Sequence, residues 1–451
     1  MRYSYFIGLV FLITQHLSLA QDLKIDPQFY EIIEQVSAER LEADIRKLAG
    51  FGTRHTMSDT VSKTRGIGAA RRWIRQEFDK ISSDCGNCLE VYTQRTLVEG
   101  DSSTRITRDT WVVNVYVIKR GTRYPNRYVI MSGDIDSRVS DPLNYKDNSP
   151  GANDNATGMA GAIELARVLS NYSFESSVIL AGLSGEEQGL YGGRFLAEKA
   201  KEEGWEIVGI LNNDMIGNIE GVDGVIDNRS FRIFSEPYFQ ETTLREFQMK
   251  RFYGGETDGV SRQLARYIYE TTKKYMPEMN PILIYRLDRF GRGGHHRPFN
   301  EAGFAGVRIM EAHENYTRQH QDIREEDGIK YGDVIEGVNF DYCRKMTAVN
   351  AVALAALASA PPAPTNVKIG GIVEPNTRLG WDRVTDDHVI GYKIYWRDTT
   401  SPVWQYSRFV GDTDQFILDG IVIDNFLFGV STVGKNGHES VVSYPSGILR
   451  N

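Results

Sequence analysis

The stretch 176–193 reads S-S-V-I-L-A-G-L-S-G-E-E-Q-G-L-Y-G-G. Residues 178–183 form an apolar run with the length of one buried strand. Two acids, Glu186 and Glu187, follow this strand directly, and a glycine-rich segment comes after them. Where strands alternate with helices, ligands collect at the carboxyl ends of the strands. The stretch therefore predicts a buried strand with a polar site at its end.

Strand and helix patterns alternate on both sides of this stretch. Apolar residues recur at spacings of three and four over residues 28–50 and 66–82, which predicts helices in both segments. Further helices are expected over Gly158–Leu169 and Asp341–Ala358, and strands over Trp111–Ile118, Tyr128–Met131, Val178–Leu183, Ile207–Leu211 and Ala305–Met310. This alternation predicts an α/β domain whose sheet carries helices on both faces.

The composition changes after A-S-A-P-P-A-P-T-N at residues 358–366, a segment typical of a linker. Beyond it the chain consists of short alternating strands, whose apolar positions include Trp381, Tyr392 and Phe428. This part resembles a fibronectin type III sandwich. We expect the α/β domain to span residues 21–360 and a small all-β sandwich to span residues 361–451. The sandwich shows no chemistry of its own, so we expect it to bind a surface or polymer, or to act as a spacer.

The first twenty residues, M-R-Y-S-Y-F-I-G-L-V-F-L-I-T-Q-H-L-S-L-A, carry one positive charge, then an apolar segment, then small residues before Ala20. This order is typical of a secretory signal peptide, and the apolar segment is too short for a retained membrane span. We therefore expect cleavage after Ala20 and a soluble protein, secreted or periplasmic. With 52 basic and 60 acidic residues, the chain is not expected to bind nucleic acid or an anionic membrane.

Three cysteines stand at positions 85, 88 and 343. Cys85 and Cys88 form a single C-x-x-C, which in an exported chain is more typical of a local disulfide or two plain thiols than of zinc or redox chemistry. Cys343 lies in a helical segment and is expected to be a small core residue.

Other acids follow predicted strands and turns in the same way as the glutamate pair. Asp134 and Asp136 lie in V-I-M-S-G-D-I-D-S-R at residues 129–138, Asp154 lies in P-G-A-N-D-N-A-T-G, and Asp214 lies in I-V-G-I-L-N-N-D-M-I-G. Buried carboxylates that lie close together share protons or bind cations, so the series predicts one or two divalent metal ions. Each aspartate alone is more typical of a turn or helix cap, and for Asp154, which precedes a helix, capping is an equal alternative.

Zinc in proteins usually takes nitrogen or sulfur ligands as well as oxygen. The α/β domain supplies histidines at His55, His295, His296, His313 and His320. A lone histidine is usually structural. The last four are grouped in F-G-R-G-G-H-H-R-P-F and E-A-H-E-N-Y-T-R-Q-H-Q-D, and this grouping favours a metal site.

The segments G-A-N-D-N-A-T-G, S-G-E-E-Q-G-L-Y-G-G and N-N-D-M-I-G resemble the signature segments of the secreted co-catalytic zinc aminopeptidase family. The same clan contains glutaminyl cyclase, glutamate carboxypeptidase and the non-enzymatic transferrin receptor. The resemblance covers about residues 30–357. It implies a mixed central sheet with helices on both faces, a metal-dependent exopeptidase activity, and peptide or protein substrates.

The resemblance implies a role for four of the acids. Asp154 matches the carboxylate that bridges two zinc ions, and the peptide bond after it is cis in the family. Glu186 matches the general base that takes a proton from the metal-bound water. Glu187 matches a ligand of one zinc ion, and Asp214 matches a ligand of the other.

The resemblance also separates the histidines. Tyr316-Thr-Arg-Gln-His320 matches the family's Y-x-x-x-H pattern, which implies that His320 is a ligand. His295-His296-Arg-Pro-Phe matches a loop that borders the substrate pocket, so His295 and His296 are expected to contact substrate or to support the ligands. His296 is the alternative ligand if His320 is not one, and His313 is expected to be structural.

The chain departs from the family pattern in the segment Gly133-Asp134-Ile135-Asp136-Ser137. The family has G-H-x-D-S there, in which the histidine binds metal and the acid orients it. Asp136 is then the orienting acid, and Asp134 stands in the ligand position.

Two different metal sites follow from this departure. One ion would be held by Asp154, Glu187 and His320, and the other by Asp134, Asp154 and Asp214. The second set consists of oxygen alone, so we expect it to hold zinc weakly or to accept manganese or magnesium. Replacing Asp134 by His is expected to raise its zinc affinity.

Hydrolysis of an amino-terminal peptide bond, with zinc as the cofactor, is the leading hypothesis. The segment 285–297 contains several arginines, among them Arg292. It is either a solvated basic loop or the source of an arginine that grips a substrate carboxylate, as in a carboxypeptidase or dipeptidase. A glutaminyl cyclase-like reaction at a single zinc ion is a further alternative. The intact acid series argues against a non-catalytic binding protein.

Overall fold

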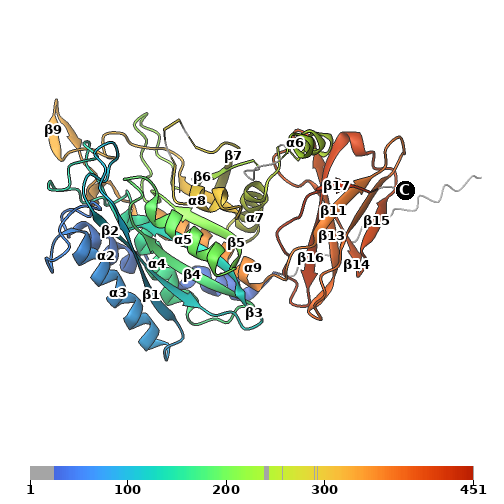
Figure 1. Ribbon diagram of the computed structural model, residues 1–451, viewed down its shortest axis with the longest axis horizontal. Helices are drawn as coiled ribbons and strands as arrows, with labels where there is room; N and C mark the ends of the chain where they lie inside the picture. Colours follow the sequence, from blue (N-terminus) through green and yellow to red (C-terminus); the bar gives the residue numbers. More distant parts are fainter. Residues whose placement is uncertain (1–24, 238–242, 256, 289, 292, 450–451) are drawn as a thin grey trace, which may run out of the picture.

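The computed structural model describes residues 25–237, 243–255, 257–288, 290–291 and 293–449 (Figure 1). The expected signal peptide over residues 1–20 and the side chain of Arg292 lie outside the described residues. Figure 1 shows a large unit of sheet and helices beside a smaller unit that consists of strands.

A mixed sheet of eight strands forms the centre of the large unit. Its strands are β1 (Glu90–Val98), β2 (Thr110–Lys119), β3 (Tyr124–Asp134), β4 (Ser176–Leu183), β5 (Glu206–Asn213), β6 (Ser230–Ser235), β7 (Asn280–Ile284) and β8 (Gly306–Glu311). Their order is β1-β2-β4-β3-β5-β8-β6-β7, and β4, β3, β5 and β8 run parallel. The expected strands are all present, and the mixed central sheet is confirmed.

Helices cover both faces of this sheet. They are α1 (Pro27–Gln35), α2 (Ala38–Ala49), α3 (Gly66–Asp84), α4 (Ala156–Leu169), α5 (Tyr191–Glu202), α7 (Val260–Tyr275), α8 (His296–Glu301) and α9 (Phe340–Ser359). The short helix α6 (Leu244–Lys250) has no buried residue and lies beside the smaller unit in Figure 1. One buried cluster joins α1–α4, α7 and α9 to Val129 and Met131 of β3. A second cluster joins α5 and α8 to Ile130, which faces the other side because successive strand residues alternate.

The helical periodicity over residues 28–50 is divided between two helices. α1 ends at Gln35, and α2 begins after Ser37, whose hydroxyl accepts a hydrogen bond from the backbone N–H of Arg40 at 3.2 Å. Serine is a favoured residue at this capping position, so the break is encoded locally. Ile32 and Leu41 still pack in the same core.

The register of the central strands brings the ends that carry acids together. Asp134 ends β3 and pairs with Leu183 at the end of β4, just before Glu186. Ser132 pairs with Asn212 of β5, and Asp214 follows that strand directly. Because these strands are parallel, their carboxyl ends meet at one edge of the sheet.

Two small sheets form the smaller unit. Its strands are β11 (Thr365–Gly370), β12 (Thr377–Asp382), β13 (Val389–Asp398), β14 (Tyr406–Gly411), β15 (Gln415–Leu418), β16 (Phe426–Gly434) and β17 (Gly447–Ile448). The sheets are ordered β15-β12-β11-β17 and β14-β13-β16. Trp381, Tyr392 and Phe428 are buried in one core between them. The likeness to a fibronectin type III domain stays a proposal, and the proposed division at residues 360/361 lies between α9 and β11.

Buried ionic contacts hold the two units together. Asp258 lies just before α7, and its carboxylate pairs with Arg266 of α7 at 2.6 Å and with Arg397 of β13 at 2.7 Å. Arg127 of β3 donates hydrogen bonds to the carbonyl oxygens of Ala360 and Pro361, at 2.8 and 3.3 Å. The sandwich is therefore packed against the large unit rather than joined to it by the connecting segment alone.

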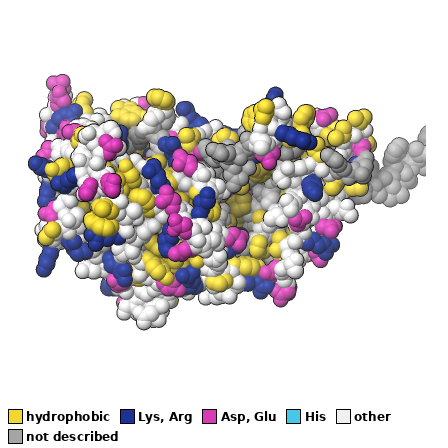
Figure 2. Space-filling model, viewed as in Figure 1, with side chains coloured by type: hydrophobic (Ala, Val, Ile, Leu, Met, Phe, Trp, Pro, Cys, Tyr) yellow, Lys and Arg dark blue, Asp and Glu magenta, His cyan; other side chains and the backbone are white. Residues whose placement is uncertain are grey.

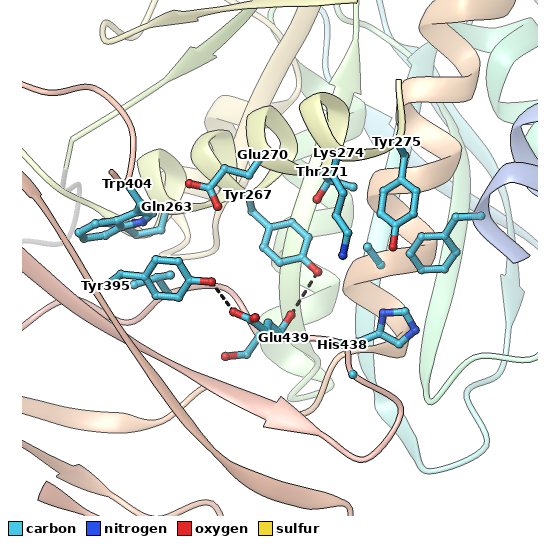
Figure 3. A pocket seen from close by; sticks show the side chains of 15 residues that line it. Gln263, Tyr267, Glu270, Thr271, Lys274, Tyr275, Tyr395, Trp404, His438 and Glu439 are labelled. Carbon is cyan, nitrogen blue, oxygen red and sulfur yellow. Dashed lines mark hydrogen bonds between the residues drawn. The ribbon is translucent and has the colours of Figure 1, made fainter. Parts of the chain in front are cut away.

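A pocket of about 290 Å³ lies between α7 and the smaller unit (Figure 3). In it the hydroxyl of Tyr395 donates to the Glu439 carboxylate, and the hydroxyl of Tyr267 donates to the Glu439 carbonyl. Oε1 of Glu270 has no hydrogen-bond partner among the described residues. Burial, together with the nearby Glu439 carboxylate, raises the pKa of Glu270 from 4.5 to about 7.

This raised pKa predicts a stability change that depends on pH. Ionising Glu270 costs more in the folded protein than in the unfolded chain, so the penalty is absent below about pH 4.5 and complete above about pH 7. We expect Glu270→Gln to raise the free energy of unfolding at pH 8.5 by about 1–3 kcal/mol and to change it little at pH 4.5. Urea unfolding at both pH values measures this.

Glu202→Gln is the matched control, because Glu202 lies exposed on α5. That variant is expected to leave the stability unchanged at both pH values. Equal stabilisation by Glu270→Gln at pH 4.5 and pH 8.5 would contradict the assignment of the penalty to ionisation.

The cysteines, the helices and the surface charges can be compared with what the sequence predicts. Cys85 and Cys88 form a disulfide at the end of α3, and Cys343 is a buried free thiol of α9. Among the described residues, no helix is both long and apolar enough to cross a membrane. Basic and acidic side chains are interspersed on the face shown in Figure 2.

Candidate metal centre

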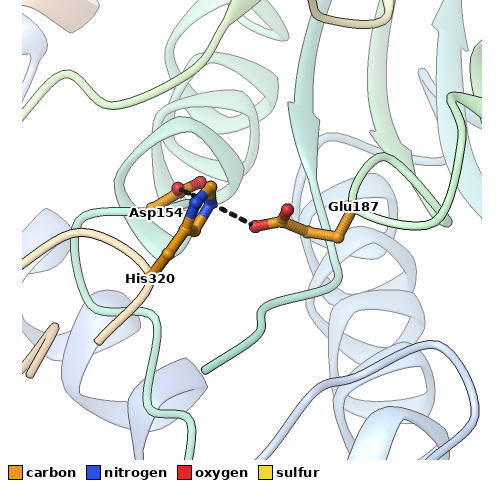
Figure 4. Close-up of side chains that lie close together, drawn as sticks. All are labelled: Asp154, Glu187 and His320. Carbon is orange, nitrogen blue, oxygen red and sulfur yellow. Dashed lines mark hydrogen bonds and ion pairs between the residues drawn. The ribbon is translucent and has the colours of Figure 1, made fainter. Parts of the chain in front are cut away.

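Three side chains from separate parts of the chain meet at the edge of the sheet (Figure 4). Nε2 of His320 lies 2.8 Å from Oε1 of Glu187 and 2.9 Å from Oδ2 of Asp154. One ligand atom of each residue lies within 4.8 Å of the others. Two carboxylates and an imidazole are a donor set that fits zinc, and three protein ligands leave a position open for substrate or water.

Neighbouring side chains fix the backbone that presents Asp154. The Asp333 carboxylate accepts the backbone N–H groups of Asn153 and Asp154, at 2.8 and 2.7 Å. The Asp154–Asn155 peptide bond is cis, as the family resemblance implied. The N-cap of α4 is Asn155, whose side-chain oxygen accepts from the Gly158 N–H at 3.0 Å. The capping alternative considered for Asp154 therefore applies to Asn155 instead.

Asp136 holds the turn that presents the glutamate pair. Its carboxylate is buried and accepts the backbone N–H groups of Gly185, Glu186 and Glu187, at 2.7, 3.2 and 3.0 Å. We predicted Asp136 as an acid that orients a ligand at position 134. In the structure its hydrogen bonds instead orient the backbone of Glu186 and Glu187.

Arg138 is a site residue that sequence reasoning missed. Its Nε donates to Oε2 of Glu187 at 2.7 Å, and its Nη2 lies 2.7 Å from Nδ1 of His320. It therefore holds two of the three candidate ligands at once. The available signal was its place directly after the G-D-I-D-S segment. His320 itself has φ +54°, a conformation uncommon outside glycine, at the point where it turns toward Glu187.

The charges of the cluster favour a bound cation. Burial lowers the pKa of His320, but the carboxylates of Glu187 and Asp154 outweigh it and raise that pKa to about 9. Burial, with Glu187 and Asp214 nearby, raises the pKa of the Glu186 carboxyl well above its usual range. Carboxylates this close and this buried are stabilised by a positive charge among them.

Asp134 and Asp214, the other two predicted ligands, are engaged elsewhere. Asp134 is buried, and its Oδ2 accepts a hydrogen bond from Nδ2 of Asn155 at 2.6 Å. Oδ2 of Asp214 lies 2.8 Å from Nη2 of Arg308. Within the described residues, no second group of three possible ligands comes as close together as Asp154, Glu187 and His320.

The two adjacent histidines lie in the interior. Nδ1 of His295 accepts from the Gly193 N–H at 3.1 Å, so Nε2 carries the proton of the neutral ring and faces Oδ1 of Asp134 at 3.5 Å. Nε2 of His296 lies 3.7 Å from Oε1 of Glu236. Burial lowers the pKa of both rings to about 3, so both are neutral. These surroundings favour a supporting role over substrate contact, and His296 does not join the cluster as the alternative ligand.

A cleft of about 390 Å³ opens over the cluster. Its acidic lining consists of Asp154, Glu186, Glu187 and Asp214. Its basic lining includes Arg105, Arg138, Arg194 and Arg297. Arg297 belongs to the arginine-rich segment 285–297. Arg105 and Arg194 come from segments that carry no indication of a site in the sequence.

Comparisons with known proteins match the chain to metallopeptidases. The model of peptidase family M28 matches residues 114–334. A probable zinc metalloprotease of Pyrenophora teres f. teres is 41% identical over 424 residues, which cover 93% of this chain and 87% of the relative. A probable zinc metalloprotease of Pyrenophora tritici-repentis is 36% identical over 433 residues, which cover 94% of this chain and 99% of the relative.

The fold also has solved counterparts. The LapA aminopeptidase of Legionella pneumophila superimposes with a TM-score of 0.55 and 14% identity, covering 76% of this chain and 77% of that one. LapB of the same organism superimposes with a TM-score of 0.54 and 16% identity, with the same coverage. At these identities the likeness shows the fold alone.

Proposed function

Because the chain belongs to peptidase family M28, we propose that it is an exported zinc-dependent exopeptidase that removes residues from the amino terminus of peptides. The observation that carries this proposal is the group of Asp154, Glu187 and His320 on the floor of an open cleft, with Glu186 beside it. Zinc held by these three residues would act as a Lewis acid that activates water and polarises the scissile carbonyl.

Glu186 is the proposed general base. Its side chain lines the cleft, but it does not belong to the group of three ligands, so its carboxylate is available for proton transfer. It accepts the proton that the attacking water loses and returns this proton to the leaving amine. Asp136 keeps this carboxylate next to Glu187, because it holds the backbone of both residues.

The lining of the cleft also supports a second candidate. Glu186 would attract a protonated amino terminus, as an aminopeptidase requires. Arg105, Arg194 and Arg297 would instead attract a carboxylate, as a carboxypeptidase or dipeptidase requires. Arginine is the residue best suited to paired hydrogen bonds with a carboxylate, so these three side chains are a specific reason to test the carboxyl end.

One set of peptides separates these activities. The same sequence is offered with both ends free, with the amino end acetylated, and with the carboxyl end amidated, and the products are identified by mass spectrometry. We expect acetylation to abolish cleavage and amidation to change kcat/KM by less than about threefold, since only the amine is then recognised. The reverse pattern would establish a carboxypeptidase, and loss in both cases a dipeptidase.

A peptide that begins with glutamine tests the cyclase alternative. Loss of ammonia without chain cleavage would indicate a glutaminyl cyclase-like reaction and would contradict the exopeptidase proposal. Glu187→Gln is the control protein for every substrate, because loss of a proposed zinc ligand removes activity that belongs to this centre and leaves activity from a contaminant.

The exported location and the sandwich are part of the proposal. The signal-like residues 1–20 and the Cys85–Cys88 disulfide support an oxidising compartment. For residues 361–451 we propose a fibronectin type III-like domain that binds a surface or polymer. The buried ion pair between its Arg397 and Asp258, just before α7, argues against a purely flexible spacer.

A further inference from the structure

A buried arginine lies where the acid series predicts a second metal ion. Arg308 belongs to β8, opposite Asn212 of β5, and is 1% exposed. Its Nη2 lies 2.8 Å from Oδ2 of Asp214, and its Nη1 donates to Oδ2 of Asp288. Burial lowers the pKa of the Arg308 guanidinium, but Asp214 and Asp288 outweigh it and hold that pKa above its ordinary value.

Asp134, the other residue expected to hold that ion, has one of its two carboxylate oxygens hydrogen-bonded. Asp134 stands where the family has a histidine ligand, and its Oδ2 is hydrogen-bonded to Asn155. Its Oδ1 has no hydrogen-bond partner among the described residues, and Nε2 of His295 lies 3.5 Å from it. Asp134, Asp154 and Asp214 do not form a second close group of ligand atoms within the described part of the chain. The residues Asp154, Glu187 and His320 therefore fit one zinc ion. The residues expected to hold a second ion do not fit it.

We infer that the protein holds one zinc ion per chain, at Asp154, Glu187 and His320, and that Arg308 provides the positive charge beside Asp214 in place of a second ion. This inference rests on the proposed zinc centre. It changes the role of Asp214 from a metal ligand to the anchor of Arg308, and it makes Arg308 a positioning residue.

The electrostatic reason is direct. A guanidinium remains charged at every pH that the protein tolerates, and it cannot act as a ligand. A divalent ion that bound Asp214 would lie next to this fixed cation, and because Asp214 and Arg308 are both buried, solvent would screen the repulsion between the two positive charges only weakly. Separating Arg308 from Asp214 and Asp288 would leave a buried positive charge unpaired. Because that state is high in free energy, Arg308 stays paired with these two carboxylates.

Zinc stoichiometry is the first test. The protein is stripped with a chelator, reloaded with excess zinc, dialysed, and measured by elemental analysis against protein concentration. We expect one zinc per chain. Two tightly held ions would overturn this inference and leave the proposed zinc peptidase intact. A content of zero would overturn this inference together with the zinc centre of the proposed function.

Asp214→Asn and Asp154→Asn are the matched variants for the second test. We expect Asp214→Asn to keep one zinc per chain, since Asp214 is not a ligand and Arg308 retains its pairing with Asp288. Asp154→Asn is expected to lose the ion. Loss of zinc from Asp214→Asn would overturn the inference, provided that circular dichroism shows both variants to be folded.

Two changes at Arg308 test whether this residue excludes a second zinc ion. Arg308→Lys keeps a cation and is expected to keep one zinc per chain. The double variant Asp134→His with Arg308→Met removes the cation and restores an imidazole, so we expect its zinc content to rise from one to two. If this variant is folded and still holds one zinc, Arg308 does not exclude the second ion and the inference fails.

Discussion

We expect Glu186→Gln to lower kcat by about 10²–10⁴-fold while the zinc content of the protein stays unchanged. Glutamine has the size and shape of the glutamate side chain, but its amide cannot accept the proton of the attacking water. Glu186 lines the cleft without belonging to the three-residue cluster, so the substitution removes the base and leaves the ligands. Steady-state kinetics and elemental analysis on the same preparation measure both quantities.

Glu187→Gln is the matched control, because it makes the same chemical change one position along the chain. Oε1 of Glu187 lies 2.8 Å from His320, and its Oε2 accepts from Arg138. We expect this variant to lose zinc and activity together. If Glu186→Gln retains more than about a tenth of the kcat, or loses its zinc, Glu186 is not the base.

Asp258→Ala is expected to lower the free energy of unfolding by about 3–5 kcal/mol, because it leaves two buried guanidinium groups without their shared counter-charge. Asp258 is 3% exposed, and it pairs with Arg266 of the large unit and Arg397 of the sandwich. Both arginines keep hydrogen bonds to carbonyl oxygens, at Pro402 and Ser401, but neither bond offsets a full positive charge. Urea unfolding measures the loss.

Asp79→Ala provides the comparison for this prediction. Asp79 pairs with Arg75 on the surface of α3, and its side chain is 50% exposed. Removing an exposed ion pair of this kind costs less than about 1 kcal/mol. A similar loss in both variants would mean that the contact between the two units adds nothing beyond an ordinary surface pair.

Much of the architecture was predictable because it is encoded over short distances. The central strands are nearly continuous apolar runs, as in β4, where every residue is buried. Long helices such as α4 and α9 carry the periodicity of a helix packed in the interior. The one division that periodicity did not indicate, between α1 and α2, is caused by a serine cap.

The acids of the site were predictable for the same reason. Each follows a strand or a tight turn in a segment of a few residues, and the carboxyl ends of parallel strands lie at one edge of the sheet. His320 was placed by its family pattern, and the structure brings it to Asp154 and Glu187. The contacts of each carboxylate could not be predicted from these local segments.

The sequence by itself therefore determined the α/β class, the central strands and the acids at their ends, since these depend on local patterns of hydrophobicity and turns. The tertiary structure alone decided that Arg138 holds Glu187 and His320, and that Arg308 holds Asp214. These pairs join residues far apart in the chain. A charged side chain has no local signature of its partner, because its pairing depends on which strands become neighbours in the sheet.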